Sequence, residues 1–410
     1  MSDRPIVVMK FGGTSVAHAA GRQALSGRVQ AALELGRAPV VVVSAMGRDG
    51  APYATDTLLG LVRDLPADDR ERDLLASCGE TIAAVLVAHE LRGAGIDAVA
   101  FTGADAGIAT DAVHGAATIE EVHPSALLAT LGTGRVPVVA GFQGVTIDGS
   151  ITTLGRGGSD TTACALGVGL GAEAVEIYTD VDGVMSADPR TCEGAGVLTV
   201  IGADELFQMA RHGSRVVHTP AAELALSSGL AVRVRNTFSS HEGTLVADVR
   251  HYVPAGVATA VAHTDDIARV TVVLPAAEET REHMAAQTRI YRAMADAGVS
   301  LDMFTPVGQL LTFTVPGALA GRAGGVLREL GAEPVVRTGC AKITLVGAGM
   351  HGVPGVMARM AEHLAGAGVD ILQAADSHTT ISVLVPGTQA RAAIEALHEG
   401  FGLGTGGECA

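Results

Sequence analysis

The sequence predicts an α/β protein with a parallel-rich sheet between helix layers, followed by two copies of a smaller α+β unit. Up to about residue 246, short Val- and Ile-rich runs alternate with longer amphipathic stretches, as in β-α-β folds. From residue 265 the order changes to β-α-β-β-α, which occurs twice at intervals of about 70 residues. Hydrophobic residues make up 48% of the 410 residues, enough for the cores of two or three domains.

The elements of the first region follow from hydrophobic pattern and length. Runs rich in β-branched residues predict buried strands at 5–11, 38–44, 136–142 and 174–179. The stretches between them predict helices at 18–35, 72–94, 119–132 and 161–171.

The second region contains the repeated unit. The first copy is predicted as strand 267–274, helix 278–297, strands 300–304 and 309–315, and helix 320–330. The second copy is predicted as strand 342–346, helix 353–366, strands 370–374 and 380–385, and helix 389–401. We therefore expect domains at 1–250, 265–338 and 339–410, a linker at 251–264, and strands that the two small domains can exchange.

Composition excludes several classes of protein. The formal charge is −16, without a basic stripe, so nucleic-acid binding lacks its electrostatic basis. The apolar run at residues 6–9 is too short for a signal peptide or a membrane span. The five cysteines lie far apart and form no Cys-x-x-Cys pair, which indicates free thiols in a reducing compartment. We expect a cytoplasmic protein with no membrane partner and no protein-bound metal site.

A glycine-rich turn, Lys10-Phe11-Gly12-Gly13-Thr14-Ser15, directly follows the first predicted strand. Two glycines let the backbone approach a ligand and expose N–H groups. Lys10 adds a mobile positive charge at the strand end, where α/β sheets bind ligands. The pattern suits a phosphate site, but a Lys-x-Gly-Gly turn after a strand is more often an ordinary structural turn, so this motif alone does not establish the function.

A second glycine-rich segment runs from Thr153 to Thr162 and contains Gly155-Arg156-Gly157-Gly158-Ser159-Asp160. Ser159 and Asp160 suit a helix N-terminus, so a simple capped loop is one interpretation. Capping does not need an arginine among glycines, however, and an exposed guanidinium can bind a carboxylate through two hydrogen bonds. Asp160 could then orient Lys10 or a substrate ammonium group.

A third motif, Tyr178–Arg190, follows the strand predicted at 174–179 and contains two turn signals, Asp182-Gly183 and Asp188-Pro189. Thr179 and Asp180 lie at the end of that strand, where they could contact the ribose or the phosphates of a nucleotide.

Taken in order, these three motifs resemble the aspartate kinase family. Val42–Gly47, Gly141–Gly144 and Arg233–Leu245 carry the same resemblance, and the repeated C-terminal unit resembles a tandem of ACT domains. The resemblance covers nearly the whole chain and implies an amino-acid kinase fold followed by two ACT domains. Pro52–Leu59 and Asp376–Thr380 resemble the diaminopimelate-sensitive type most closely.

The resemblance also implies roles for individual residues. Lys10, Arg156 and Asp160 would be catalytic. The residues that would bind L-aspartate are Ser44, Thr55, Glu80, Arg156 and Ser159. Those that would hold ATP, with its Mg²⁺, are Lys10, Phe11, Gly12, Gly13, Thr179, Asp180, Met185, Asp188, Arg190, Ser214 and Arg215. An amino-acid effector would meet Asp302, Gly349 and Asp376. For Glu80, a plain surface position on a helix is the alternative.

The implied activity is phosphorylation of the L-aspartate side chain by ATP, giving 4-phospho-L-aspartate. This would be the first step toward lysine, threonine, methionine and diaminopimelate, with feedback regulation through the ACT domains. A carboxylate is ionised at neutral pH, so the reaction needs positioning and positive charge rather than a general base. Diaminopimelate, lysine and threonine are the candidate effectors, and pairing of ACT domains predicts a homo-oligomer.

Three departures from the family pattern leave alternatives open. Gly213-Ser214-Arg215 replaces the usual Gly-Ala-Lys or Gly-Ser-Lys, 217–221 lacks the usual Arg, and Asp302–Pro306 lacks the common Asn. These departures leave the identity of the effector open and allow a specialised paralogue that phosphorylates a related amino acid. A non-catalytic amino-acid sensor is a separate alternative. The C-terminal repeats could also serve only as a dimerisation platform.

Overall fold

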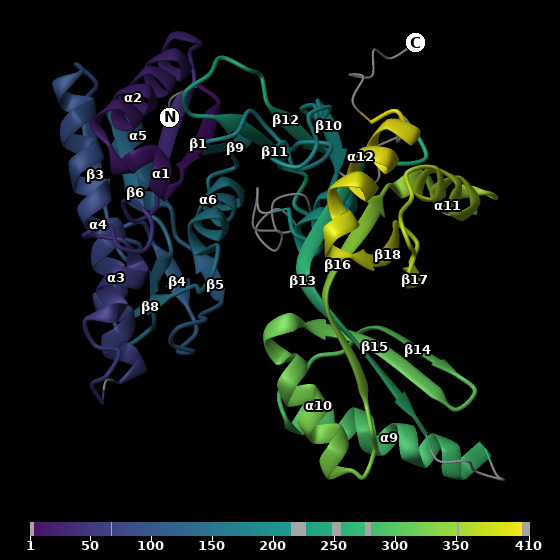
Figure 1. The fold of residues 1–410 in the computed structure, drawn as a ribbon. Helices are drawn as coiled ribbons and strands as arrows, with labels where there is room; N and C mark the ends of the chain where they lie inside the picture. Colours follow the sequence, from purple (N-terminus) through teal and green to yellow (C-terminus); the bar gives the residue numbers. More distant parts are fainter. Residues whose placement is uncertain are drawn as a thin grey trace. The chain divides into compact units, whose positions relative to one another are not determined.

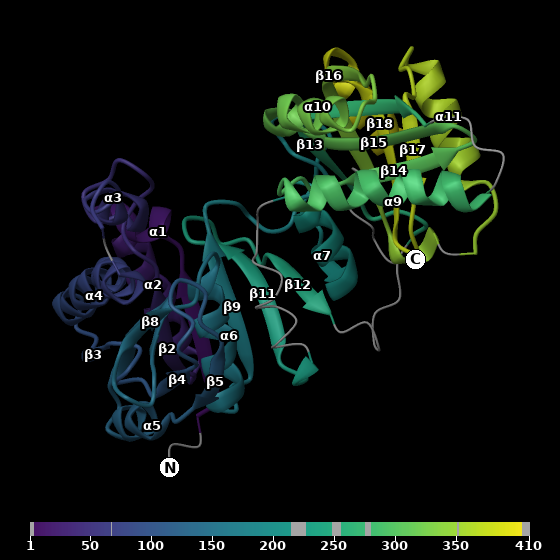
Figure 2. The ribbon, with the colours of Figure 1, turned by 90° about the horizontal axis from the view of Figure 1, so that it is seen from below.

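The computed structural model describes residues 4–66, 68–214, 227–247, 256–274, 280–350 and 352–403, and Figures 1 and 2 show it from two directions. The chain forms two compact units. The first comprises Met1–Val184, Val197–Ala210 and Arg215–Val253, and the second comprises Met185–Gly196, Arg211–Ser214 and Pro254–Ala410. Arg215, predicted to hold ATP, and the altered segment 217–221 lie outside the described residues.

The first unit is built on an eight-stranded sheet in the order β10-β12-β11-β9-β1-β2-β6-β3. Neighbouring strands are parallel except for the β11–β12 pair. The bounds are β1 Ile6–Phe11, β2 Ala38–Val43, β3 Ala98–Phe101, β6 Val136–Ala140, β9 Ala174–Thr179, β10 Val200–Gly202, β11 Ala231–Asn236 and β12 Thr244–Ala247. The four strands predicted in this region are therefore confirmed.

Alternation along β1 decides where its one charged side chain points. Val7, Met9 and Phe11 pack into the core beneath α2 (Ala19–Glu34) and α4 (Asp69–Gly93). Because successive side chains on a strand face opposite sides of the sheet, Lys10 points to the other face. There it meets α6 (Gly158–Gly169). The helices α1 (Gly13–Ala17), α3 (Thr55–Gly60), α5 (Ser125–Gly132) and α7 (Ala203–Arg211) complete this unit.

Helix α4 begins at a cap, because the Asp68 side chain accepts a hydrogen bond from the Arg70 N–H at 3.0 Å. It is the one helix in the described part of the chain whose length and composition would suit a membrane span, and half of its most apolar window is buried in the protein. Ala83, Val87 and Leu91 lie against the sheet with at most 1% of their surface exposed, as in a core helix.

The helix predicted at 119–132 is wrong for its first part. Residues Ile119–Val122 form β5, which pairs with β4 (Ile108–Thr110) in a small sheet of order β5-β4-β7-β8. Pro124 separates this strand from α5, because the residue before a proline is disfavoured in the helical region. The other two strands are β7 (Gln143–Val145) and β8 (Ile151–Thr153).

The second unit contains one six-stranded antiparallel sheet of order β14-β15-β13-β16-β18-β17. Its strands are β13 Ala260–Val273, β14 Asp302–Val307, β15 Leu310–Pro316, β16 Val335–Val346, β17 Gln373–Asp376 and β18 Thr380–Pro386. The helices are α9 Thr280–Asp296, α10 Ala320–Glu329, α11 Val356–Gly366 and α12 Ala390–Gly400, with short turns η1 Gly317–Leu319, η2 Ala348–Met350 and η3 Gly387–Gln389.

The long strand β13 serves both repeats. Residues 260–264 pair with 342–346 in the second repeat, whereas 267–273 pair with β15 in the first. The predicted linker at 251–264 is therefore wrong at its end, because 260–264 form part of this strand; residues 251–255 lie outside the described chain. Apolar side chains at Val261, Val270 and Val272 explain the extension, since each is buried in a core.

The predicted boundary of the first domain also needs correction, because Met185–Gly196 packs within the second unit. Ala187 and Cys192 lie in the same apolar core as α11 and α12. Ser186 Oγ lies 2.8 Å from Nε2 of His398, and its carbonyl accepts the Val261 N–H at 2.8 Å. Burial lowers the pKa of His398, which favours the neutral form of its ring.

We predict that Ser186→Ala loosens this segment, because it leaves buried groups of His398 and Gly196 without their hydrogen-bond partner. The expected cost is about 1–3 kcal/mol, seen as faster amide hydrogen exchange in 185–196 and α12. Ser377→Ala is the control, since Ser377 bonds only to Thr380 in its own turn. Equal exchange in the two variants would contradict the prediction.

Candidate active site

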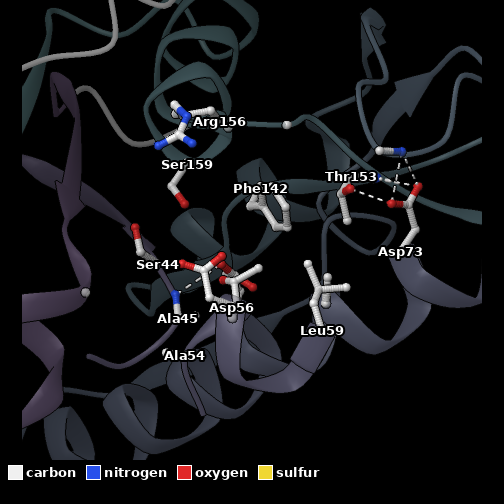
Figure 3. A pocket seen from close by; sticks show the side chains of 18 of the residues that line it. Ser44, Ala45, Ala54, Asp56, Leu59, Asp73, Phe142, Thr153, Arg156 and Ser159 are labelled. Carbon is white, nitrogen blue, oxygen red and sulfur yellow. Dashed lines mark hydrogen bonds between the residues drawn. The ribbon is translucent and has the colours of Figure 1, made fainter. Parts of the chain in front are cut away.

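The first unit contains a cavity of about 600 Å³ at the carboxyl ends of β1, β2 and β6 (Figure 3). Helices α3, α4 and α6 close its sides. Of the sequence-predicted residues, it brings together Lys10, Gly13, Ser44, Thr55, Glu80, Arg156, Ser159 and Asp160. These residues come from five separate segments, and all of them lie within one unit.

Lys10 and Asp160 form an ion pair, with Nζ 2.7 Å from Oδ1 and side chains only 13% and 10% exposed. Asp160 lies in the first turn of α6, where the helix dipole favours a carboxylate. Gly157 begins that helix with a φ of 74°, a left-handed conformation that suits glycine. The pair holds the ammonium group of Lys10 at the floor of the cavity.

Close backbone contact explains the glycine at position 13. A Cβ there would lie 2.6 Å from the Ala45 carbonyl oxygen and 2.8 Å from that of Gly47. The Gly47 N–H also donates to the Gly13 carbonyl at 3.1 Å. The turn after β1 therefore touches the turn after β2, and a side chain at position 13 would force them apart. Phe11 is fully buried and stacks on Tyr178 at 4.6 Å, so only its backbone is available to a nucleotide.

Glu80 is a buried acid, not the surface helix residue of the alternative interpretation, since only 3% of it is exposed. Its Oε1 accepts the Ala45 N–H at 3.1 Å, whereas its buried Oε2 accepts no hydrogen bond of normal geometry from the described residues. Burial raises the pKa of Glu80 to about 7, although the Ala45 N–H and the Thr55 side chain act in the opposite direction. A cationic group in the cavity would stabilise the ionised form.

Arg156 is exposed and forms no ion pair with any acid in the described part of the chain. It stands between Gly155 and Gly157, both left-handed with φ of 72° and 74°. Figure 3 shows its guanidinium on the same side of the cavity as the Ser159 hydroxyl. The site therefore offers a free cation at one side and a buried, under-satisfied acid, Glu80, at another.

Asp73 and Phe142 are among the cavity residues that the sequence-based predictions missed. Asp73 on α4 is 2% exposed and accepts hydrogen bonds from His114, Gly115 and Thr153. Phe142 follows β6 with a φ of 70°, an uncommon conformation for a bulky residue and a sign of a constrained site. The Gly141–Gly144 motif contains Phe142 and could have pointed to it, but no local pattern marks Asp73.

The ends of β1 and β9 form the side predicted for the nucleotide. The Gly12 N–H donates to the Tyr178 carbonyl at 3.3 Å, so the two strand ends lie together. Thr179 donates to Asp180 at 3.1 Å, and Asp180 is 3.3 Å from Arg48. These contacts place Thr179 and Asp180 at the same sheet edge as Gly12, and their contact with ATP stays a prediction.

Four other residues predicted to bind ATP belong to the second unit: Met185, Asp188, Arg190 and Ser214. Arg190 is paired with Asp188 at 2.6 Å, and its hydrogen bond holds the pKa of Asp188 below the usual value. None of the four is among the residues that line the cavity of the first unit, and their contact with ATP stays a prediction. Within the described chain no cluster of His, Cys, Asp and Glu has the arrangement of a metal site.

The residues predicted to meet an effector lie in the second unit. Asp302 already forms an ion pair with the buried ammonium of Lys342. Burial raises the pKa of Asp302, but the hydrogen bond and charge of Lys342 outweigh it, and the pKa lies below the usual value. Gly349 packs closely on Gly256, and Asp376 is exposed at the end of β17. Gln373 on β17 donates to the Met303 carbonyl on β14, so the two outer strands of the sheet meet.

Comparisons with known proteins agree with this architecture. Residues 5–236 match the amino acid kinase family, and residues 335–399 match the ACT domain. Aspartokinase 1 of Bacillus subtilis is 44% identical over 406 residues, which cover 97% of this chain and 99% of that protein. The crystal structure of Clostridium acetobutylicum aspartate kinase covers 96% of this chain and 100% of its own, with a TM-score of 0.81 and 21% identity. E. coli aspartokinase III, solved with aspartate and ADP, covers 96% and 99% with a TM-score of 0.74 and 24% identity. With an amino-acid kinase unit, an ACT-type unit and a full-length relative at 44% identity, this chain belongs to the aspartokinase family.

Proposed function

We propose that the cavity transfers the γ-phosphoryl group of ATP to the side-chain carboxylate of L-aspartate, giving 4-phospho-L-aspartate and ADP. The observation that carries this proposal is that, within the described part of the chain, one cavity contains both a buried acid and an unpaired cation. Among the described residues, Glu80 presents a buried oxygen that accepts no hydrogen bond of normal geometry, and Arg156 presents a guanidinium that pairs with no acid. An α-amino acid with a second carboxylate supplies an ammonium for the first and a carboxylate for the second.

Each group has a separate task in this arrangement. Glu80, supported by Thr55, binds the substrate ammonium. Arg156, beside Ser159, binds the α-carboxylate, which leaves the side-chain carboxylate free to react. The bidentate geometry of a guanidinium fixes direction as well as charge. Ser44 lies at the cavity wall after β2, where its hydroxyl is available to the substrate.

The transfer needs little covalent chemistry from the protein. The ionised side-chain carboxylate attacks the γ-phosphorus, the bond from that phosphorus to the β–γ bridging oxygen breaks, and ADP leaves with the electron pair. Lys10 places positive charge next to the moving phosphoryl group, and Asp160 orients Lys10. Mg²⁺ arrives with ATP and shields the phosphates. Gly12 and Gly13 allow close approach of the phosphates, while Thr179 and Asp180 contact the nucleotide at the edge of β9.

A hydroxamate-trapping assay tests this function directly, because hydroxylamine captures an acyl phosphate. The purified chain is given ATP and Mg²⁺ with L-aspartate, L-glutamate, N-acetyl-L-aspartate or aspartate β-methyl ester. We expect ATP-dependent product with L-aspartate only, because the N-acetyl group removes the ammonium and the ester removes the nucleophile. Product formed without ATP is subtracted, since hydroxylamine also attacks the ester directly. Preference for another acid would indicate a specialised paralogue. No turnover of any acid, with binding retained, would indicate a sensor.

The second unit regulates the kinase as an ACT-type sensor in this proposal. Its ligand is an end-product amino acid, with diaminopimelate as first candidate and lysine and threonine next. E. coli aspartokinase III has been solved with lysine and aspartate. An effector inhibits if it binds the less active state better, and a tenfold preference corresponds to about 1.4 kcal/mol per site. Pairing of the ACT-type sheets between chains would give a homo-oligomer.

Replacing Lys10 tests the electrostatic role. We predict that Lys10→Ala lowers kcat by roughly 10²-fold or more, as for other groups that stabilise developing charge, with little change in KM for aspartate. Steady-state kinetics measure both values. Lys10→Arg is the matched variant, since it keeps the charge and should retain more activity. Near-normal turnover by a folded Lys10→Ala enzyme would reject the role.

The pKa of Glu80 predicts how aspartate binding depends on pH. Only ionised Glu80 attracts an ammonium, and its pKa is about 7 in the free enzyme, so KM for aspartate should rise about tenfold from pH 8 to pH 6. KM for ATP, measured in parallel, should not share this slope. Glu80→Gln should have a high KM for aspartate at every pH and no slope in this range.

The same pKa gives a check on stability. The folded protein binds the Glu80 proton more tightly than the unfolded chain, so the stability contribution of Glu80 falls as pH rises from about 4.5 to 7. Glu80→Gln should therefore raise Tm of the ligand-free enzyme above pH 7. A Tm lower than that of the unmodified enzyme there would contradict the unfavourable burial of the charge.

The ion pair of Asp302 with Lys342 makes a prediction about the effector. An effector ammonium that binds Asp302 must displace Lys342, so Lys342→Met should tighten effector binding, and Asp302→Asn should weaken it. Kinase activity and Tm are titrated with diaminopimelate, lysine and threonine, singly and in pairs. If no amino acid changes either value in the unmodified protein, the sensing role is rejected and the platform interpretation stands.

A further inference from the structure

Asp73 binds two chain segments that are distant in sequence. Its Oδ1 accepts the Gly115 N–H at 3.0 Å and the Thr153 hydroxyl. Its Oδ2 accepts His114 Nδ1 at 2.8 Å and the Thr153 N–H at 3.1 Å. Buried charge is costly unless fully hydrogen-bonded, and here the donors fill both oxygens. Figure 3 shows this cluster at the side of the cavity, beside Thr153.

Asp73 and Glu80 differ in whether a carboxylate oxygen remains without a hydrogen bond. They are seven residues apart on α4, which is two helical turns, so both side chains lie on the face toward the cavity. Glu80 keeps one oxygen without a hydrogen bond, whereas Asp73 keeps none. Asp73 is therefore unsuited to bind a substrate ammonium, and its carboxylate is used entirely within the protein.

The segments that Asp73 binds support the loop of Arg156. Thr153 is the last residue of β8, and its carbonyl accepts the Ala117 N–H at 2.9 Å. The Gly115 carbonyl oxygen lies 3.2 Å from the position of a Cβ on Gly155. The turn that carries His114 and Gly115 thus packs against Gly155, the residue before Arg156. The hydrogen bonds of Asp73 connect both this turn and the end of β8 to α4.

The Arg156 loop needs such external support. Glycines flank Arg156 on both sides, and glycine backbones lose the most conformational freedom when they become ordered. The Arg156 side chain has no ion-pair partner among the described residues that would hold it in place. Its direction is therefore determined by the backbone at 153–157, which Asp73 anchors at one end.

We propose that Asp73 is a positioning residue for substrate selectivity: it fixes residues 153–157 so that Arg156 can recognise the non-reacting carboxylate of the amino-acid substrate. The inference rests on the proposed function. Asp73 acts through Arg156 and contacts neither the phosphoryl group nor the nucleotide. Its loss should consequently weaken discrimination between a carboxylate and a neutral amide at the α-position, while leaving ATP binding nearly unchanged.

The test compares L-aspartate with L-aspartate α-amide, which keeps the reacting side chain and the ammonium but lacks the α-carboxylate. Asp73→Asn has nearly the same shape. Its NH₂ group is a donor, however, and it would face the donor groups that now bond to the carboxylate. We expect its kcat/KM preference for L-aspartate over the amide to fall about tenfold or more, with KM for ATP changed less than about twofold. In the Arg156→Lys background, the Asp73→Asn change should reduce the preference little further, because the two residues act as one unit.

Two further variants keep the test decisive. Thr153→Val retains the backbone N–H but removes one donor to Asp73, so it should shift the preference in the same direction by less, even if Asp73→Asn does not fold. Asp111→Asn is the matched control, because Asp111 accepts the Val113 and Thr118 N–H groups in the same turn without bonding to Thr153. It should keep the preference of the unmodified enzyme.

Three outcomes would overturn the positioning role. The preference could be unchanged in folded Asp73→Asn and Thr153→Val, or the losses toward aspartate and ATP could be equal. The effect of Asp73→Asn could also multiply independently with that of Arg156→Lys. If the unmodified enzyme does not phosphorylate L-aspartate, the proposed function itself fails. The two failures are therefore distinguishable.

Discussion

The ion pair of Lys10 with Asp160 joins the two glycine-rich segments on which the site is built. Lys10 ends up on the α6 side of the sheet because its neighbours on β1 fill the opposite core. Asp160 lies in the first turn of α6, only four residues after Arg156. The pair therefore sets the distance between the turn after β1 and the loop of Arg156. If these segments bind phosphate and carboxylate as proposed, a change in the geometry of the pair would move the two substrates relative to each other.

In the proposed reaction the cavity accepts two anions, although the formal charge of the chain is −16. Its three buried acids are handled in different ways. Asp160 is neutralised by a lysine, Asp73 is saturated with donors, and Glu80 is left with a pKa near neutrality until a cation arrives. None of the three therefore presents an uncompensated charge toward a phosphate or carboxylate. The local field comes from Lys10, Arg156 and the helix N-terminus.

The sequence was informative where the chemistry is local. Lys10, Gly13, Arg156 and Asp160 stand in short glycine-rich motifs after strands, and the structure places them in one cavity. Asp73 could not be found in this way, since its partners lie 41 to 80 residues away and none forms a motif with it.

Tertiary packing explains the remaining errors. Residues 119–132 have a helical hydrophobic pattern, but pairing of Ile119–Val122 with β4 prevails over it. Residues 185–196 follow a kinase motif in sequence, yet Ala187 and Cys192 find their apolar partners in α11 and α12. The partner of Ile119–Val122 lies close by in sequence, but the three-residue strand β4 has no hydrophobic pattern long enough to reveal it. The placement of 185–196 could not be predicted, because it depends on a surface formed by distant residues.

The sharing of β13 between the two C-terminal repeats limits how this region can change in evolution. A recombination event between residues 338 and 339 would separate the repeats in sequence but not in the fold, because 260–264 would stay with the wrong partner. Either half alone would expose an unpaired strand edge, which promotes aggregation. Gain, loss or exchange of this unit by a kinase gene is therefore expected to involve both repeats together, with breakpoints before residue 260.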